Sequence, residues 1–562
     1  MSNHTQEVSD PRATSESHPG FSKDMRSGLG RLLKSAAIAL GVTSIYMFWD
    51  LGPLVTPTHD TVYHWSGSAA GLFVPPIADF GIFWLIFTLL FWLARRPGRA
   101  RVSLWSGTIL FVPWISLKNW AIFSGTLIPA LASHAFFLSA TIALLLLLAL
   151  WRPSFEVMFE RYVEFLSSLL LVSALSGVVI VSQAVWFGWE ARSLNADMPL
   201  HRSSSDPARS TGKARVIWIL FDELSYRQVY EHRFPGLSLP AFDALASQGA
   251  VFTHAIPAGV WTERVLPSLM TGERVDDIRS SADGRQLSLH HPDSKEWKAF
   301  DERDTVFEDA LESHYSTAVA GWYNPYCRIL PDVLDRCFWS YKLPTENAII
   351  PDATLWTNIL NPFLYFFSGG MGYRITSLVS HAPAMTVLNA KSHISDFEGL
   401  SDATDRTLDD RSAGFVFLHL PVPHPGGIYD RNTGEVASAH SDYIDNLALA
   451  DKLLGHIRSK LEQNGEWDSS TIVVMGDHSW RTKILWMNMP GWTERERAAS
   501  QGEFDDRPGY LVKLPDQHSG THIDMPFDAL NTRPLLDALL ARRIESPEDL
   551  SAWVKQRAPL PR

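Results

Sequence analysis

Cysteine is scarce in this chain, with two residues among 562. So few cysteines exclude a disulfide-stapled scaffold and a cysteine-rich zinc domain. Basic residues are also in the minority, since 49 Lys and Arg face 61 Asp and Glu and give a formal net charge of −12. This balance excludes a nucleic-acid-binding protein held by general basicity. The sequence contains no GxGxxG after a strand and no GxxxxGK[ST], so nucleotide binding through those loops has no support.

Apolar residues are plentiful, and they are concentrated before residue 190. Residues 1–22 are polar and rich in Ser, which predicts a disordered tail. Five apolar stretches follow, at about 35–55, 71–94, 103–125, 131–151 and 163–187. Each reaches ~20 residues, the length that spans ~30 Å of hydrocarbon as a helix. We therefore expect a transmembrane domain of five helices over 23–190.

Basic residues beside these stretches predict the orientation of the chain. Lys and Arg cluster before the first stretch (Lys23, Arg26, Arg31, Lys34) and between the second and third (Arg95, Arg96, Arg99, Arg101). The loop at 56–70 contains neither residue type. Because positive charge accumulates on the cytoplasmic side, the N-terminus is expected in the cytoplasm. An odd number of spans then places everything after residue 190 outside it.

The second half has the pattern of an α/β domain. A polar linker at 191–213 precedes short apolar runs that alternate with amphipathic stretches. The expected strands are 215–221, 249–253, 316–320, 414–420, 471–475 and 509–513, and the expected helices are 239–247, 304–313, 440–464 and 533–542. Continuous apolar strands alternating with helices are typical of a mostly parallel sheet covered on both faces. The domain is expected over 214–545, with a C-terminal tail at 546–562.

Acids and histidines follow several of these strands. Asp222 and Glu223 come after the first, and Asp477 and His478 follow 471–475 through Gly476. In parallel sheets the chemistry lies at the carboxyl ends of the strands, and carboxylate and imidazole ligands suit Zn²⁺ or Mn²⁺. A single Asp at a strand end is also a common helix cap. The two pairs together indicate a divalent-metal site.

Thr262 precedes an expected helix in the segment AIPAGVWTERVLPSLMTGE at 255–273. A hydroxyl at this place caps a helix in many proteins. The functional alternative is a nucleophile, which a metal or a base must activate. A helix N-terminus also favours an anionic phosphoryl group.

These motifs together resemble the alkaline phosphatase/sulfatase superfamily. The matching features, in order over 214–545, are a strand followed by FDELS, then AFDALASQGAVFTHAIPAG, a hydroxyl residue six before the Ser of SLMTG, and a strand followed by GDH. Membrane spans followed by such a domain resemble lipoteichoic acid synthases and lipid A phosphoethanolamine transferases. The resemblance implies a bacterial inner (cell) membrane protein with a periplasmic or extracellular catalytic domain.

The resemblance also implies roles for single residues. The implied metal ligands are Asp222, Glu223, Thr262, Asp477 and His478. Glu223 is the better ligand of its pair by this analogy, and Thr262 matches the nucleophile. His424, in LPVPHPG, resembles a histidine that binds the substrate phosphate or a second metal, whereas His419 is expected to be a packed strand-end residue. His518 and His522 in DQHSGTHID loosely resemble a late histidine near the site, so His424 and His522 are the candidates for proton transfer.

Two departures set this chain apart from true sulfatases. Sulfatases carry C/S-x-P-x-R, whose Cys or Ser becomes formylglycine, but this sequence has TERVL at 262–266, and Thr cannot form that aldehyde. The Lys and His of the sulfatase GKWH segment are replaced in GWYN at 321–324, which implies a different head group. Trp322 and Asn324 either line the substrate pocket or only pack.

Cys327 and Cys337 lie ten residues apart. A disulfide is expected outside the cytoplasm, and two buried thiols are the alternative.

The leading functional interpretation is a membrane-anchored, metal-dependent phosphotransferase. It takes a head group from a membrane phospholipid and gives it to a surface glycan or lipid through Thr262. A phosphoester or sulfuric ester hydrolase of the same fold is the first alternative. A non-catalytic membrane sensor or scaffold is the second, and the combined presence of Glu223, Thr262, Asp477 and His478 argues against it.

Overall fold

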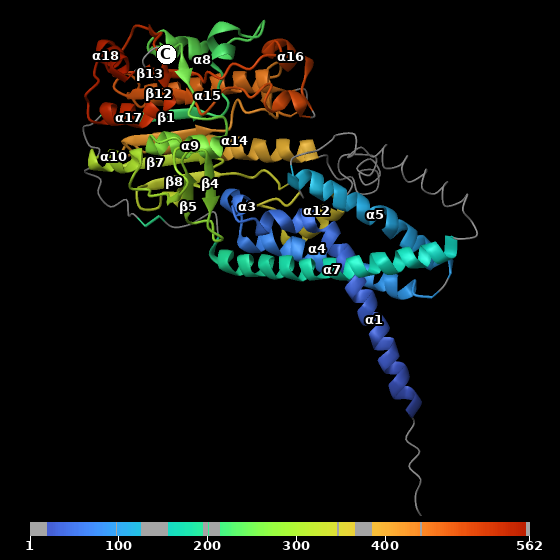
Figure 1. Cartoon of the computed structure of the whole chain (residues 1–562). Coiled ribbons are helices and arrows are strands. Elements are labelled where there is room, and N and C mark those ends of the chain that lie inside the picture. Colours follow the sequence, from blue (N-terminus) through green and yellow to red (C-terminus); the bar gives the residue numbers. More distant parts are fainter. Residues whose placement is uncertain are drawn as a thin grey trace, which may run out of the picture. The chain divides into compact units, whose positions relative to one another are not determined.

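The computed structural model describes residues 19–96, 98–124, 155–194, 200–201, 214–345, 348–365, 385–438, 441–489 and 491–557. Two compact units divide the chain (Figure 1). One comprises Met1–Leu51 and Ala78–Ser182, and the other comprises Gly52–Ile77 and Gln183–Arg562. The first contains most of the residues of the long apolar helices and is called the membrane unit below. The second contains the α/β fold that the sequence analysis expects to be catalytic, and it is called the catalytic unit below.

Long helices make up the described part of the membrane half: α1 (Pro19–Tyr46), α4 (Ala69–Leu93), α5 (Arg99–Ser124) and α7 (Phe155–Glu190). Three stretches are long and apolar enough to cross a membrane, Gly28–Tyr46, Ala69–Leu93 and Val157–Ser193. Three candidate spans are therefore shown in the described residues, and not the expected five. The expected third span is the helix α5, in which Lys118 interrupts the apolar run, and the expected fourth lies outside the described residues.

A segment from the first half of the sequence belongs to the catalytic unit. It contains the short helix η1 (Gly52–Val55) and α3 (Asp60–His64). The buried guanidinium of Arg328 donates hydrogen bonds to the backbone carbonyls of Val62 and Tyr63. The hydroxyl of Ser66 donates to the carbonyl of Tyr341 at 2.6 Å. The expected loop after the first span is thus part of the catalytic fold.

An eight-stranded sheet is the centre of the catalytic unit. Its order is β14 (Thr521–Ile523), β2 (Ala250–Phe252), β13 (Tyr510–Lys513), β12 (Thr471–Gly476), β1 (Val216–Phe221), β9 (Phe415–Leu420), β7 (Thr317–Trp322) and β8 (Arg336–Ser340). Only β13 runs antiparallel to its neighbours. The prediction of an α/β domain with a mostly parallel sheet is confirmed.

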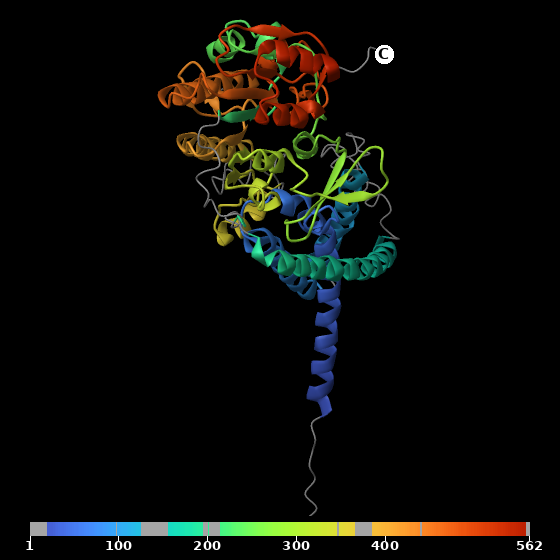
Figure 2. The same cartoon turned by 90° about the vertical axis from the view of Figure 1, so that its left-hand side faces the viewer.

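Hydrophobic cores lie on both faces of this sheet because successive side chains of a strand point in opposite directions. Val216, Trp218 and Leu220 of β1 join a core with α9 (Thr262–Thr271), α10 (Val306–Glu312) and α17 (Thr532–Leu540). Ile217, Ile219 and Phe221 join the other core, with α8 (Pro240–Ala246), α14 (Met385–Asp409) and α15 (Tyr443–Gln463). In Figure 2 the orange helices α14 and α15 and the red helices near the C-terminus lie on different sides of this unit. Burial on both faces explains the unbroken apolar run of β1.

Four short helical turns are η3 (Ala191–Ser193), η4 (Arg227–Glu231), η5 (Trp486–Asn488) and η6 (Ala529–Asn531). Other smaller elements complete the described chain. They are α2 (Phe48–Leu51), the antiparallel sheet β4 (Asp277–Ser280), β5 (Leu287–His290) and β6 (Trp297–Ala299), the pairs β3 (Ala255–Ile256) with β15 (Phe527–Asp528) and β10 (Tyr429–Asp430) with β11 (Glu435–Val436), and α11 (Tyr326–Ile329), α12 (Leu355–Tyr365), α16 (Glu494–Ser500) and α18 (Pro547–Arg557). The expected C-terminal tail forms α18, whose Leu550 and Val554 are buried in the core. A disulfide joins Cys327 of α11 to Cys337 of β8, with the two Cα atoms 5.6 Å apart.

Candidate functional site

The carboxyl ends of β1 and β12 bring two acids and a histidine together. These strands pair in parallel with Phe221 opposite Gly476, so the residues that follow them lie side by side. Asp222, Asp477 and His478 each offer a ligand atom, and these atoms all lie within 4.8 Å of one another. All three side chains are buried.

The hydroxyl of Thr262 lies at the centre of this group. Its Oγ1 is 2.8 Å from Oδ2 of Asp477, 3.3 Å from Oδ2 of Asp222 and 3.2 Å from Nε2 of His478. Thr262 is the first residue of α9, and the N-cap of that helix is Trp261. Its hydroxyl therefore faces the acids at the strand ends and does not occupy the capping position.

Both ring nitrogens of His478 lie close to oxygen atoms. Nδ1 is 3.0 Å from the carbonyl oxygen of Ser479, and Nε2 is 3.0 Å from Oδ2 of Asp477. In the tautomer that donates Nδ1–H to Ser479, Nε2 presents a lone pair toward Thr262 and Asp477. Burial lowers the pKa of His478 to about 3. A neutral imidazole with a free Nε2 is the form that ligates a metal or accepts a proton.

These residues fit a divalent cation. Burial, together with the carboxylates of Asp477 and Glu223, raises the pKa of Asp222. Among the described residues, Oδ1 of Asp222 has no hydrogen-bond partner, and an uncompensated buried carboxylate is costly. A metal ion would neutralise both acids, and the oxygen and nitrogen donors of Asp222, Asp477, His478 and Thr262 suit Zn²⁺ or Mn²⁺.

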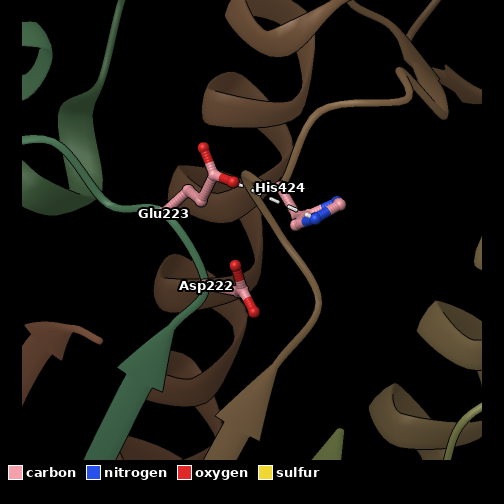
Figure 3. Close-up of side chains that lie close together, drawn as sticks. All are labelled: Asp222, Glu223 and His424. Atoms are coloured by element: carbon pink, nitrogen blue, oxygen red, sulfur yellow. Dashed lines mark ion pairs between the residues drawn. The ribbon is translucent and has the colours of Figure 1, made fainter. Parts of the chain in front are cut away.

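In the described residues, the side chains that contact the hydroxyl of Thr262 are those of Asp222, Asp477 and His478, and Glu223 is not one of them, although the resemblance favours it as a ligand. It is fully buried, and its carboxylate pairs with Arg481. It belongs to a second group with Asp222 and His424, whose ligand atoms also lie within 4.8 Å of one another. Nε2 of His424 is 4.0 Å from Oε1 of Glu223 (Figure 3).

His424 lies in the loop after β9 between two tryptophans. The ring centroids of Trp322 and Trp486 are each 5.2 Å from its own. Its Nδ1 lies 2.8 Å from the carbonyl oxygen of Pro425, so Nδ1 donates and Nε2 is free to accept. Burial is the main cause that lowers the pKa of His424 well below its ordinary value, and the ring is neutral at pH 7.

The other expected pocket residues differ in their surroundings. Trp322 is buried, and its indole donates a hydrogen bond to the buried carboxylate of Asp396 at 3.0 Å. Asn324 is buried just beyond the end of β7. His419 is a packed strand-end residue as expected, but its Nε2 also lies 3.7 Å from Oδ2 of Asp222.

The structure does not bring His518 and His522 to this site. Both side chains are exposed, and His522 lies on the edge strand β14. That strand is four positions from β1 in the sheet, a separation of about 19 Å at the usual strand spacing. The loose sequence match therefore selected two histidines that lie away from the site.

Sequence reasoning missed several residues around the site. Arg481 and Trp486 bind Glu223, and Asp396 holds Trp322. Nδ1 of His64 lies 3.3 Å from the carbonyl oxygen of Tyr323. The one available signal was the position of Arg481, a cation three residues after His478. Trp486 lies five residues after Arg481 but in no recognisable pattern, and Asp396 and His64 come from remote segments.

Comparisons with known proteins found structural similarity only. No family model and no curated protein matches the chain. A phosphonate monoester hydrolase of Agrobacterium radiobacter is 16% identical, with 58% of this chain and 74% of that chain covered at a TM-score of 0.37. The lipoteichoic acid synthase LtaP from Listeria monocytogenes is 16% identical, with 60% and 74% covered at a TM-score of 0.33. Murine ectonucleotide pyrophosphatase/phosphodiesterase 5 is 11% identical, with 62% and 100% covered at 0.32. At these TM-scores the similarity by itself assigns no function to the chain.

Proposed function

We propose that this chain is a membrane-anchored, metal-dependent phosphotransferase of the alkaline phosphatase/sulfatase type with Thr262 as its nucleophile. The observation that carries the proposal is the hydroxyl of Thr262, which lies within 3.3 Å of two buried carboxylates and an imidazole. A packing role for Thr262 would not require three polar partners from the ends of two strands. The order of the FDELS, SLMTG and GDH motifs in the sequence supports the same assignment.

Asp222, Asp477, His478 and Thr262 would hold the metal, Zn²⁺ or Mn²⁺. When bound, such an ion lowers the pKa of the threonine hydroxyl and neutralises charge on the phosphoryl oxygens. Asp477 Oδ2 is the closest acceptor for the hydroxyl proton, at 2.8 Å. The first turn of α9 presents backbone N–H groups near Thr262, and these favour an anionic phosphoryl group.

In the first step, Oγ1 of Thr262 attacks the phosphorus of a phospholipid head group. The bond between phosphorus and the diacylglycerol oxygen breaks, and that oxygen leaves as an alcohol after taking up a proton from water. The head group remains on Thr262 as a phosphodiester. Such a covalent route divides one difficult transfer into two easier ones.

In the second step, a hydroxyl of a surface glycan or lipid attacks the same phosphorus, and the bond between phosphorus and Oγ1 of Thr262 breaks. Oγ1 takes back the proton held by Asp477. His424 takes the proton of this acceptor, because its Nδ1 is already donated to Pro425 and its Nε2 is free. Trp322 and Trp486 enclose the imidazole and limit its rotation. Asn324 is the proposed polar contact for the head group.

Membrane anchoring supports a lipid donor. The three candidate spans belong to the same chain as the catalytic unit, so enzyme and lipid share one surface. We place five spans in the inner membrane of a bacterium, with the N-terminus cytoplasmic and the catalytic unit periplasmic or extracellular. This orientation rests on two loops. The loop at 95–101 is rich in Arg, as cytoplasmic loops are, whereas the loop at 56–70 contains no Lys or Arg.

Trapping the intermediate tests the proposal. Purified protein is incubated with lipid vesicles of mixed head groups, quenched in acid, digested and analysed by peptide mass. The expected result is one head-group phosphate on the peptide that contains Thr262. Comparison of membrane lipids and surface glycans with and without the gene then names donor and acceptor. Release of free phosphorylated head group with no acceptor product would indicate a hydrolase.

A further inference from the structure

The carboxylate of Glu223 already has a full set of hydrogen-bond donors. Nε of Arg481 lies 2.8 Å from Oε1, Nη2 donates to the same oxygen, and the backbone N–H of Arg481 lies 3.1 Å from Oε2. The indole N–H of Trp486 lies 3.0 and 2.9 Å from the two oxygens. Each carboxylate oxygen therefore has at least two donors, which is near its accepting capacity.

Arg481 is itself held in place. Its guanidinium lies 5.1 Å from the ring centroid of Trp261 and 5.9 Å from that of Trp486. Its Nη1 lies 3.5 Å from the carbonyl oxygen of Val260. Aromatic faces stabilise a nearby cation, and more strongly where water is excluded. The side chain is 7% exposed, so this arginine is part of the interior and does not belong to the solvated surface.

The location of this ion pair matters because it lies in the second ligand group. Asp222, Glu223 and His424 place their ligand atoms within 4.8 Å of one another, a spacing that suits a cation. Of these three side chains, Glu223 has its negative charge neutralised by Arg481. Asp222 instead directs Oδ2 toward Thr262.

We propose that Arg481 is a built-in second cation of this site. Its guanidinium holds Glu223 in place of a second metal. The centre consequently takes up one divalent ion, at Asp222, Asp477, His478 and Thr262, and Glu223 is not one of its ligands. This inference rests on the proposed function, because it assumes that one metal ion binds at the Thr262 site.

Metal stoichiometry tests the proposal without measuring turnover. The full chain is purified in detergent, stripped with a chelator and titrated with Zn²⁺ and separately with Mn²⁺. Bound metal is counted by mass spectrometry of the desalted protein, and the Kd is measured against a competing chelator. The wild-type protein should bind one equivalent. Glu223→Gln, which keeps the shape of the side chain, should also bind one equivalent with an unchanged Kd.

Removal of the guanidinium should open the second position. In Arg481→Met, Glu223 is free to join Asp222 and His424, and a second equivalent should bind. Arg481→Lys keeps the positive charge and should remain at one equivalent. Arg215→Met is the matched control, because Arg215 is also buried and lies 2.7 Å from Glu466 just before β1. It should remain at one equivalent.

Two equivalents in the wild-type protein would overturn the proposal, as would loss of the metal in Glu223→Gln. A folded Arg481→Met that still binds one equivalent would overturn it as well. If Arg481→Met does not fold, Glu223→Gln and Arg481→Lys still decide the matter. Absence of any tight metal in the wild-type protein, or an unchanged Kd in Asp222→Asn, would instead count against the proposed function.

Discussion

Oγ1 of Thr262 lies 2.8 Å from Oδ2 of Asp477, although the two residues are 215 positions apart in the sequence. The same carboxylate oxygen lies 3.0 Å from Nε2 of His478. The hydroxyl therefore belongs to a polar cluster that α9 and β12 build jointly. The first predictions test whether this cluster performs the chemistry.

Thr262→Ala should lower the rate of head-group transfer by about 10³-fold or more, as expected when a nucleophile is removed. Folding and membrane insertion should be retained. Thr262→Ser keeps the hydroxyl and should recover part of the rate. Transfer from labelled phospholipid vesicles is the measurement. If the hydroxyl only stabilised α9, Ala would cost about 1 kcal/mol of stability and leave most of the activity.

Asp477→Asn and His478→Gln should weaken metal binding by more than about 100-fold, beyond the loss typical of residues that only orient a ligand. The physical reason is the loss of one buried ligand atom at a time from a small cluster. Chelator competition gives the Kd. His518→Gln and His522→Gln serve as controls, because both side chains are exposed and lie away from this cluster. Equal weakening in the controls would contradict the assignment.

The segment Gly52–Ile77 should stabilise the catalytic unit. Without it, the buried guanidinium of Arg328 loses the carbonyls of Val62 and Tyr63, at a cost of about 3 kcal/mol for an unpaired buried charge. A fragment of 191–562 should therefore unfold at a lower temperature than the same fragment fused to 52–77. Arg328→Met should reduce the difference in melting temperature between the two fragments, since the apolar methionine side chain needs no hydrogen-bond acceptor. Equal melting temperatures would contradict the prediction.

Stability should fall in mild acid because of buried histidines. Burial lowers the pKa of His64 from 6.5 to about 4. Between these pH values the unfolded chain binds more protons than the folded one, so the free energy of unfolding decreases as the pH falls, by up to about 1.4 kcal/mol per pH unit for one such group. His64→Gln should reduce this slope relative to the wild type in urea unfolding at pH 7, 6 and 5. Identical slopes would show that His64 does not contribute.

A reporter that is active only outside the cytoplasm should be active when fused after residue 195. The same reporter fused after Arg99 should be inactive, because basic loops remain in the cytoplasm. Enzyme activity of the two fusions, at matched expression, is the measurement. The reverse pattern would place the catalytic unit in the cytoplasm.

Most of the sheet was predictable from the sequence, because its strands are short apolar runs between helices. The expected strands 215–221, 414–420 and 471–475 match β1, β9 and β12 within one residue. These runs are readable because burial on both faces leaves mainly apolar residues in them, with His419 and Thr471 as the polar exceptions within β9 and β12. β8 was missed since its sequence, RCFWS, mixes charge with aromatic residues at the edge of the sheet.

The candidate site was predictable only where a motif is local. Asp222, Asp477 and His478 directly follow their strands, so their meeting follows from the parallel sheet. The partner of Glu223 was not predictable, because Arg481 is 258 residues away. No local sequence pattern links the two residues, and they meet only in the folded chain. Glu223 and Asp222 are adjacent in sequence, and only the structure shows that Asp222 contacts Thr262 whereas Glu223 contacts Arg481.

The chain passes between its two units three times, after Leu51, after Ile77 and after Ser182. A protease that cuts the polar stretch at 202–213 therefore leaves Gly52–Ile77 bound to the catalytic fold through Arg328 and Tyr341. That segment continues into the membrane helices at both of its ends. A single cut should not release the catalytic unit from the membrane helices, whereas a domain carried on one stalk would be released.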